Sequence, residues 1–317
     1  MLLTRRDVGR LALGAAAAAA RMSAKPNSNF GGVQIGVITY SFRALPGSAE
    51  EILKYTVDCG LSGIELMSYT AEAYAGAPIS AMRTPGGQKS GKKSGNKNSA
   101  AELTKWRLAA SMDKYKAFRK MYEDAGVKIY AFKLPPTMAM SDAEYDYIWN
   151  VAQTLGANHV TTELPEDDEL LHRVAEYAAK RKLRIAFHTH GQGGSSNFGK
   201  VLAASPYTAL NFDVGHFYGV NGESPVPMME KYHDRIASLH LKDRKGPGSA
   251  GENKGRPGGP NMPWGQGETP LKEVLQVMKK RKYKFPASIE YEYDTPAGSD
   301  VLTEVKKCVE YCKKALA

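Results

Sequence analysis

The sequence predicts a single (β/α)8 barrel, or TIM barrel, formed by residues 31–317. Eight short apolar runs recur along the chain, and stretches with a helical pattern of apolar residues lie between them. The last five runs each end in an acidic residue or a histidine. Eight strand-then-helix units in a chain of 317 residues favour a closed barrel over a doubly wound sheet.

The first 24 residues are expected to be an export signal that lies outside this fold. A basic segment, Thr4-Arg5-Arg6, precedes an uncharged stretch from Leu11 to Ala20 that is too short to span a membrane as a helix. Adjacent arginines in this position are typical of twin-arginine export, a route that carries folded proteins. We therefore expect a periplasmic or secreted protein with no membrane attachment after cleavage. An uncleaved amphipathic segment is the alternative.

Short apolar runs give the eight predicted strands. Most of them are rich in β-branched or aromatic side chains, as is typical of buried strands. The predicted strands are Val33 to Ile38, Gly63 to Met67, Val127 to Phe132, Asn158 to Glu163, Leu183 to His188, Ala209 to Asp213, Ile236 to His240 and Ala287 to Glu290.

Amphipathic stretches between these runs give the predicted helices. They are Ala49 to Asp58, Ser111 to Ala125, Asp142 to Leu155, Asp168 to Lys180 and Pro270 to Lys280. Gly60, Gly126 and Gly156 follow three of them and predict that each helix ends there, because glycine adopts the left-handed conformation that often closes a helix.

Two intervals exceed the spacing of roughly 25 to 30 residues per unit that a barrel of about 250 residues implies. They are 68–106, which contains a run of Gly, Ser and Lys, and 244–267, which is rich in Gly and Pro. Both follow predicted strands, so these insertions are expected to lie over the C-terminal mouth of the barrel. Long loops at that end are more often lids or partner contacts than packing elements.

The net charge of +10 raises the question of an anionic partner. Much of the excess is local, because the segment 83–107 carries seven basic residues against the single acid Glu102. This segment is rich in Gly, Ser and Asn, whereas a nucleic-acid surface interleaves basic residues with aromatic ones on a stable element. We expect a solvated loop and no nucleic-acid partner.

Three cysteines are too few and too unevenly spaced for a disulfide framework. Cys308 and Cys312 lie four residues apart in a predicted helix and are expected to be packing residues. A metal site formed by this pair is the weaker alternative.

Four strand ends carry candidate metal ligands. Glu163, Asp213, His240 and Glu290 each close a predicted strand. Because the C-terminal ends of barrel strands meet at one mouth, these side chains are expected to converge on one divalent ion. Carboxylate and imidazole ligands together suit Mn, Co, Zn or Mg. The alternative is that each is an ordinary polar residue at the end of a strand.

At these residues the chain resembles the xylose isomerase-like TIM barrels, which include sugar epimerases, inosose dehydratases, hydroxypyruvate isomerase and, more distantly, enzymes of the endonuclease IV type. The resemblance covers nearly all of residues 31–317 and implies a single divalent metal held by Glu163, Asp213, His240 and Glu290, with His190 and His216 around it. The segments that carry it are Phe212-Asp213-Val214-Gly215-His216, Leu239-His240-Leu241-Lys242-Asp243, Phe187-His188-Thr189-His190-Gly191, the strand ending at Glu290, and Trp264-Gly265-Gln266-Gly267-Glu268.

A divalent ion and two carboxylates can perform proton transfer next to a carbonyl. An ion that chelates a hydroxy-ketone sugar polarises its carbonyl and stabilises the enediolate that forms when the neighbouring proton leaves. Glu163 and Glu290 belong to predicted strands four and eight, on opposite sides of the ring, so one can take the proton and the other can return it. Metal ligation alone is the alternative role for both.

Further side chains near the strand ends are candidates for contact with the substrate. His188 and His190 alternate along one strand, so only one is expected to face the mouth from the strand; His190 is favoured as a partner of a substrate oxygen or as an acid, and His188 is equally a core histidine. Lys242 and Lys133 can stabilise an oxyanion or form a structural salt bridge.

The segment around Trp264 is interpreted as the turn into the last helix, with the indole as a surface on which a sugar ring can stack. It lacks the longer pattern of a phosphate-binding loop. His216, Tyr40 and Glu65 complete the set of expected substrate-binding residues.

These observations favour a divalent-metal-dependent isomerase or epimerase that acts on a sugar or keto-sugar. A lyase or dehydratase that acts on an inosose or a 3-keto-glycoside begins with the same proton abstraction and is the alternative. A nuclease is disfavoured because the chain supplies one metal site and is expected to be exported. A sugar-binding barrel without catalysis is disfavoured because both Glu163 and Glu290 are present. The expected partner is a small carbohydrate, and a homo-oligomer is left open.

Overall fold

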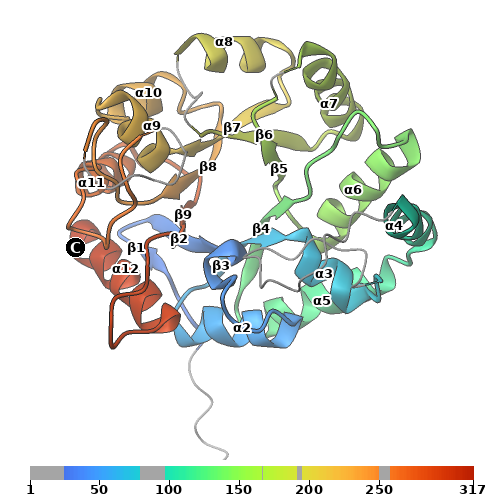
Figure 1. Ribbon diagram of the computed structural model, residues 1–317, viewed down its shortest axis with the longest axis horizontal. Coiled ribbons are helices and arrows are strands. Elements are labelled where there is room, and N and C mark those ends of the chain that lie inside the picture. Colours follow the sequence, from blue (N-terminus) through green and yellow to red (C-terminus); the bar gives the residue numbers. More distant parts are fainter. Residues whose placement is uncertain (1–24, 79–96, 166, 191–194, 250–257) are drawn as a thin grey trace, which may run out of the picture.

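The computed structural model describes residues 25–78, 97–165, 167–190, 195–249 and 258–317. Eight parallel strands form a closed barrel, in which the first strand of the ring pairs with the last (Figure 1). The strands are β2 (Val33–Ile38), β3 (Gly63–Met67), β4 (Lys128–Lys133), β5 (His159–Glu163), β6 (Arg184–His188), β7 (Thr208–Asp213), β8 (Ile236–Leu241) and β9 (Ala287–Ile289). The predicted barrel is thus confirmed, with each strand within one residue of its expected ends.

Helices surround the barrel on its outside, as the view down the ring shows (Figure 1). A short strand, β1 (Asn29–Phe30), pairs antiparallel with β2. The helices are η1 (Thr39–Phe42), α2 (Ala49–Asp58), α3 (Ser68–Ala75), α4 (Lys97–Ala109), α5 (Asp113–Asp124), α6 (Asp142–Leu155), α7 (Asp168–Arg181), α8 (Ser195–Ala203), α9 (Val214–Asn221), α10 (Val226–Lys231), α11 (Leu271–Arg281) and α12 (Val301–Leu316). Within the described ranges, no helix is both long and apolar enough to cross a membrane.

Local sequence signals account for several helix ends. Ser48 and Ser141 each form a capping box with the glutamate three residues later, which satisfies free N–H groups at the start of α2 and α6. Gly60, Gly126 and Gly156 follow α2, α5 and α6 with φ of 72°, 82° and 77°. Only glycine adopts this conformation without steric cost, so these residues end the helices where the sequence predicts.

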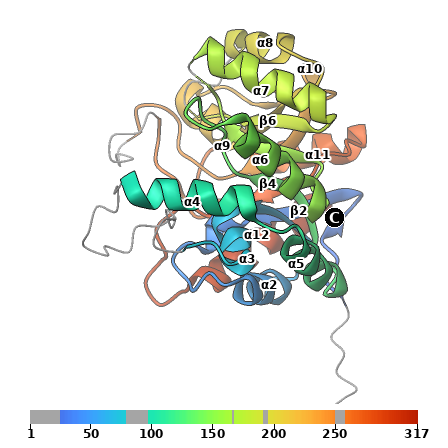
Figure 2. The ribbon, with the colours of Figure 1, turned by 90° about the vertical axis from the view of Figure 1, so that its right-hand side faces the viewer.

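The interval 68–106 differs from the loop that its composition predicts, because it contains all of α3 and most of α4. Tertiary contacts fix these helices: Arg107 of α4 donates from Nε and Nη2 to the two carboxylate oxygens of Glu72 in α3, at 2.7 and 3.1 Å. Both side chains are buried, and Tyr147 of α6 also donates to Glu72. Figure 2 shows α4 lying across the outside of the ring and extending past its neighbours.

Three predicted features lie wholly or partly outside the described residues. They are the export signal at 1–24, the first part of the basic segment 83–107 (residues 83–96), and the middle of the insertion 244–267 (residues 250–257). The three cysteines are described, and all are buried with free thiols. Burial raises the pKa of the Cys308 thiol well above its ordinary value, in keeping with a packing role.

Candidate active site

Four predicted site residues meet at the C-terminal mouth of the barrel, but they are not the four predicted ligands. Ligand atoms of His188, Asp213, His240 and Glu290 all lie within 4.8 Å of one another, and all four side chains are buried. Asp213, His240 and Glu290 are predicted to meet because each closes a predicted strand. The same reasoning applies to His188, which is the last residue of β6. These four residues are called the mouth cluster below.

Glu163, the fourth predicted ligand, lies beside the mouth cluster instead of within it. Its Oε1 is 2.8 Å from Lys133 Nζ, and its Oε2 is 3.1 Å from His190 Nδ1. Burial raises the pKa of this carboxyl, but Lys133 and His190 outweigh that effect and hold the pKa well below its ordinary value. The side chain is 45% exposed, so Glu163 is an ionised carboxylate that faces the opening.

Lys242 places an ammonium group among three carboxylates. Its Nζ lies 2.6 Å from Glu292 Oε2, 3.0 Å from Glu290 Oε2 and 3.1 Å from Asp213 Oδ2. Burial alone lowers the pKa of Lys242, but these carboxylates raise it above its ordinary value, so the group is charged. The expected salt-bridge role of Lys242 is therefore present in the structure, at the position from which it can also reach an oxyanion.

His240 links the mouth cluster to a carboxylate behind it. Its Nδ1 lies 2.6 Å from Glu290 Oε2, and its Nε2 lies 2.8 Å from Oε2 of the fully buried Glu65. Burial opposes protonation, yet the two carboxylates raise the pKa of His240 to about 10. Burial raises the pKa of Glu65, but the contact with His240 lowers it to about 2. His240 is therefore an imidazolium that donates to both carboxylates.

The donor set of the mouth cluster fits a divalent ion. Asp213 Oδ2 is buried and accepts no hydrogen bond from any described residue, although Lys242 lies close to it. The His188 ring donates from Nδ1 to Asn211 Oδ1 at 2.9 Å, and burial lowers the pKa of His188 well below its ordinary value. The neutral ring thus keeps a lone pair on Nε2, 4.0 Å from Asp213 Oδ2. Imidazole nitrogen and carboxylate oxygen together are the ligands that Mn, Co and Zn favour.

Glu65 is predicted to control the affinity of this cluster for a metal. A histidine ligand that donates its other N–H to a carboxylate is fixed in tautomer and orientation, and loss of such a partner weakens metal binding roughly 10- to 100-fold. We expect that effect for Glu65→Gln, measured by titration of Mn²⁺ or Zn²⁺ into chelated protein. The matched control is Thr161→Val, which removes the hydrogen bond to Glu65 Oε1 and leaves the contact with His240. Equal weakening by both variants would contradict this role.

His190 and His216 complete the mouth. The centroid of the His190 ring is 4.6 Å from that of His188 and 4.7 Å from that of His216. The expectation that only one of His188 and His190 faces the mouth does not describe this geometry, because residues two apart on a strand share one face, and His190 in any case lies beyond the end of β6 at His188. Arg244 donates to His216 Nδ1 at 2.7 Å, and Lys242 Nζ lies 2.9 Å from His216 Nε2, so each ring nitrogen faces a cationic side chain.

Asp213 also begins a helix. Its Oδ1 accepts from the backbone N–H of His216 at 2.7 Å, which makes Asp213 the N-cap of α9 and places His216 one turn into that helix. The close approach of α9 to β8 requires Gly215, because a Cβ there would lie 2.3 Å from the Lys242 backbone oxygen. The segment from Asp213 to His216 therefore positions both of these residues at the mouth. Gly215 within it lets α9 pack closely against Lys242.

A chain of hydrogen bonds that the sequence analysis missed runs through the barrel interior. Asn211 Nδ2 donates to Glu65 Oε2 at 2.9 Å and to Ser238 Oγ at 2.7 Å, and Ser238 Oγ lies 3.0 Å from His159 Nε2. Asn211 and Ser238 stand two residues before Asp213 and His240, so they share the inward face of their strands. The spacing of two residues from a predicted metal ligand is therefore the sequence signal that identifies Asn211 and Ser238 as inward-facing residues.

His159 is predicted to make stability depend on pH. Burial, and the nearby charges of Arg184 and His240, lower its pKa to about 4, although Glu65 opposes them. A histidine whose pKa falls on folding stabilises the protein above the unfolded pKa, roughly 6.5, and this contribution is lost as the pH falls through about 4. We expect wild-type protein to lose about 2 to 3 kcal/mol more than His159→Gln between pH 7.5 and pH 4.5. Urea unfolding at both pH values measures this difference, and equal losses would contradict it.

Two expected substrate residues have no described link to the mouth cluster. The indole of Trp264 packs edge-on against Tyr311 of α12, with 5.6 Å between ring centroids, and Tyr40 lies beneath the guanidinium of Arg43 at 4.5 Å. Among the described residues, no hydrogen bond or ring contact joins either side chain to the cluster. The structure thus shows packing contacts for both residues.

The turn that carries Trp264 binds a carboxylate of the chain itself. Asp243 accepts from the backbone N–H groups of Gly265, Gly267 and Thr269 at 2.8, 2.9 and 3.2 Å. Arg244 is fully buried and donates twice to the carbonyl of Gly259. Asp243 and Arg244, which follow Lys242, therefore hold the described part of the insertion in place. The backbone N–H groups of this turn donate their hydrogen bonds to Asp243.

Comparisons with known proteins agree with the fold. Residues 98–314 match the family model described as xylose isomerase-like TIM barrel. An inosose dehydratase from Clostridium botulinum (strain Eklund 17B / Type B) is 29% identical over 158 residues, which are 45% of this chain and 52% of that protein. The chain thus spans about half the length of this curated relative.

Solved structures share the fold at low identity. L-ribulose 3-epimerase superposes with a TM-score of 0.56 at 13% identity and covers 90% of this chain and 94% of its own. A xylose isomerase-like TIM barrel protein from Mycobacterium smegmatis in complex with magnesium gives a TM-score of 0.54 at 14% identity, covering 90% and 96%. At these identities the likeness shows the fold alone.

Proposed function

Because the chain belongs to the xylose isomerase-like TIM barrel family, we propose that it is a divalent-metal-dependent enzyme that removes the proton next to the carbonyl of a sugar or keto-sugar. The leading form of this proposal is an isomerase or epimerase. The observation that carries it is the mouth cluster, with the ionised carboxylate of Glu163 beside it.

The metal would be held by Asp213, His240 and Glu290, with either His188 or Glu163 as a further ligand. When bound, a divalent ion polarises the carbonyl of the substrate and makes the neighbouring proton more acidic. His240 must give up its Nδ1 proton to become a ligand, since both nitrogens donate in the present structure. Glu65 then keeps the proton on Nε2 and holds the ring in the orientation required.

Glu163 is suited to be the base. It is ionised and partly exposed, while Glu290 is only 5% exposed and lies beneath Lys242 and His240. Lys133 holds the Glu163 carboxylate in place, and His190 lies within reach of the same carboxylate. In an epimerisation, Glu163 would keep the proton that it removed, and a second proton would reach the opposite face of the carbon through Glu290, which would first take it up from the Lys242 ammonium 3.0 Å away.

A lyase or dehydratase is the second candidate, and the similarity to an inosose dehydratase favours it. The same base would remove the proton next to the carbonyl, and the electron pair would then expel a hydroxyl from the adjacent carbon as water. His190, 42% exposed beside Glu163, can protonate that leaving hydroxyl. The two candidates differ in the fate of the electron pair after one shared step.

Proton exchange distinguishes these candidates. Protein loaded separately with Mn, Co, Zn or Mg would be incubated in deuterated water with ketohexoses, inososes and 3-keto-glucosides, and followed by NMR. Deuterium next to the carbonyl together with a new epimer or aldose supports the isomerase, and an unsaturated product supports the lyase. Absence of exchange with every substrate, in protein shown to bind the metal, would overturn both and favour a sugar-binding barrel.

A further inference from the structure

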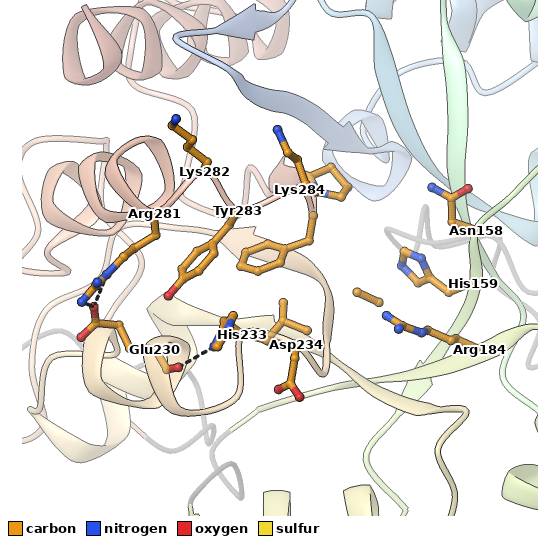
Figure 3. A pocket seen from close by; sticks show the side chains of 14 residues that line it. Asn158, His159, Arg184, Glu230, His233, Asp234, Arg281, Lys282, Tyr283 and Lys284 are labelled. Carbon is orange, nitrogen blue, oxygen red and sulfur yellow. Dashed lines mark hydrogen bonds and ion pairs between the residues drawn. The ribbon is translucent and has the colours of Figure 1, made fainter.

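An open cavity of about 930 Å³ lies at the N-terminal ends of the strands, at the opposite end of the barrel from the mouth cluster. Its lining comes from the starts of β5, β6, β8 and β9 and from the ends of α10 and α11. Figure 3 shows Arg184 and His159 on one side of this cavity and Tyr283 on the other. A volume of this size suits a small organic ligand. None of the mouth residues takes part in it.

Aromatic rings form one wall of the cavity. The ring of Tyr283 stacks on His233 with 5.2 Å between centroids and 19° between planes, and on Phe285 with 5.2 Å and 28°. His233 donates from Nδ1 to the backbone carbonyl of Glu230 at 2.8 Å, which fixes the first ring. The Phe285 ring, at the other end of this stack, is held in place because it is buried. The cavity therefore offers a preformed, partly apolar surface for a planar group.

Positive charge exceeds negative charge in the lining. Four basic side chains, of Arg184, Arg281, Lys282 and Lys284, accompany two acidic ones, of Glu230 and Asp234. Arg281 donates to Glu230 Oε1 at 2.8 and 3.0 Å, so that pair is neutral. Arg184 makes no ion pair with any residue in the described ranges, and Figure 3 shows its guanidinium directed toward the open space.

We propose that this cavity is a second binding site, for a small planar anion such as an aromatic ring that carries a carboxylate or a phosphate. The ring of the ligand packs against Tyr283 and its neighbours, and the anionic group meets Arg184. A guanidinium presents a planar fork of donors that matches both anions. The site takes no part in the proton transfer at the mouth, and its occupancy does not depend on the function proposed for that end.

Binding is tested on chelated full-length protein, so that no metal at the mouth can hold the anion. The probes are AMP and 2-naphthoate, and the uncharged counterparts are adenosine and 2-naphthol. Isothermal titration is expected to show one-to-one binding of at least one anion and at least tenfold weaker binding of its uncharged counterpart. Absence of binding by both anions would overturn the proposal.

Three variants locate the site. Arg184→Gln is expected to weaken binding of the anion at least tenfold, and Tyr283→Leu at least fivefold. The matched control is Lys128→Gln, which removes the same charge from the first position of β4 at the same end of the barrel, outside this cavity. It is expected to change the affinity less than twofold. Equal weakening by Arg184→Gln and Lys128→Gln, or no effect of Arg184→Gln, would place the anion elsewhere and overturn the proposal.

Discussion

Replacement of Glu290 by glutamine is expected to lower turnover by at least about 1,000-fold, within the range that a proton-transfer group contributes. The amide cannot accept or return a proton at neutral pH. The substitution also removes the negative charge of the carboxylate, whose Oε2 lies 2.6 Å from His240 Nδ1 and 3.0 Å from Lys242 Nζ. Because the buried carboxylate is held ionised by Lys242 and His240, with its pKa well below the ordinary value, its charge is available to a metal at neutral pH.

Glu292 supplies the matched comparison. Its carboxylate also contacts Lys242 Nζ, at 2.6 Å, but it lies outside the mouth cluster. We expect Glu292→Gln to lower turnover roughly tenfold or less, which corresponds to about 1.4 kcal/mol in the activation free energy. Steady-state rates, metal titration and circular dichroism of both variants separate a chemical role from loss of folding. A folded and fully active Glu290→Gln enzyme would rule out the two-carboxylate mechanism.

Replacement of Lys242 by methionine is expected to destabilise the metal-free protein by about 3 to 5 kcal/mol, the cost of leaving a buried ion pair without one partner. Asp213, Glu290 and Glu292 would then lie close together without the ammonium group that they share. Methionine is unbranched and of similar length, so the packing of the stem is largely retained. The measurement is the free energy of unfolding in urea at pH 7.5 after chelation.

A divalent ion is expected to restore much of the stability that Lys242→Met loses. An ion held by Asp213 and Glu290 neutralises the same carboxylates, and ligand present at 100 times its dissociation constant stabilises the folded state by about 2.7 kcal/mol. Added Mn²⁺ should therefore stabilise Lys242→Met at least as much as wild-type protein. Unchanged stability of the chelated variant would show that Lys242 does not compensate these carboxylates, and no response to Mn²⁺ would show that Asp213 and Glu290 do not hold the ion.

Local sequence patterns are enough to predict the barrel and the strand ends that carry chemistry. Short apolar runs, capping residues such as Ser48 and Ser141, and glycines such as Gly156 are local signals that act over a few residues. The end of a parallel barrel strand always lies at the same mouth. Glu163, Asp213, His240 and Glu290 could therefore be assigned to one region before any distance was known.

Which of these groups come into contact depends on the folded barrel. Glu65 and His240 are 175 residues apart and touch across the barrel, and Lys242 reaches Glu292 over 50 residues. His188 takes a place in the mouth cluster, whereas Glu163 turns to Lys133. Such contacts depend on the register and closure of the ring, which no local pattern encodes.

The same limit applies to the opposite end of the barrel and to the inserted helices. The cavity at the N-terminal ends of the strands is lined by strand starts and by the ends of α10 and α11, and these residues, between Asn158 and Pro286, carry no shared motif. Helix α4 is fixed by the buried pair of Arg107 and Glu72, which a composition rich in Gly, Ser and Lys does not reveal. Local propensity sets the elements of this protein, but burial and charge pairing between distant segments set its sites, because those energies exist only once the barrel has closed.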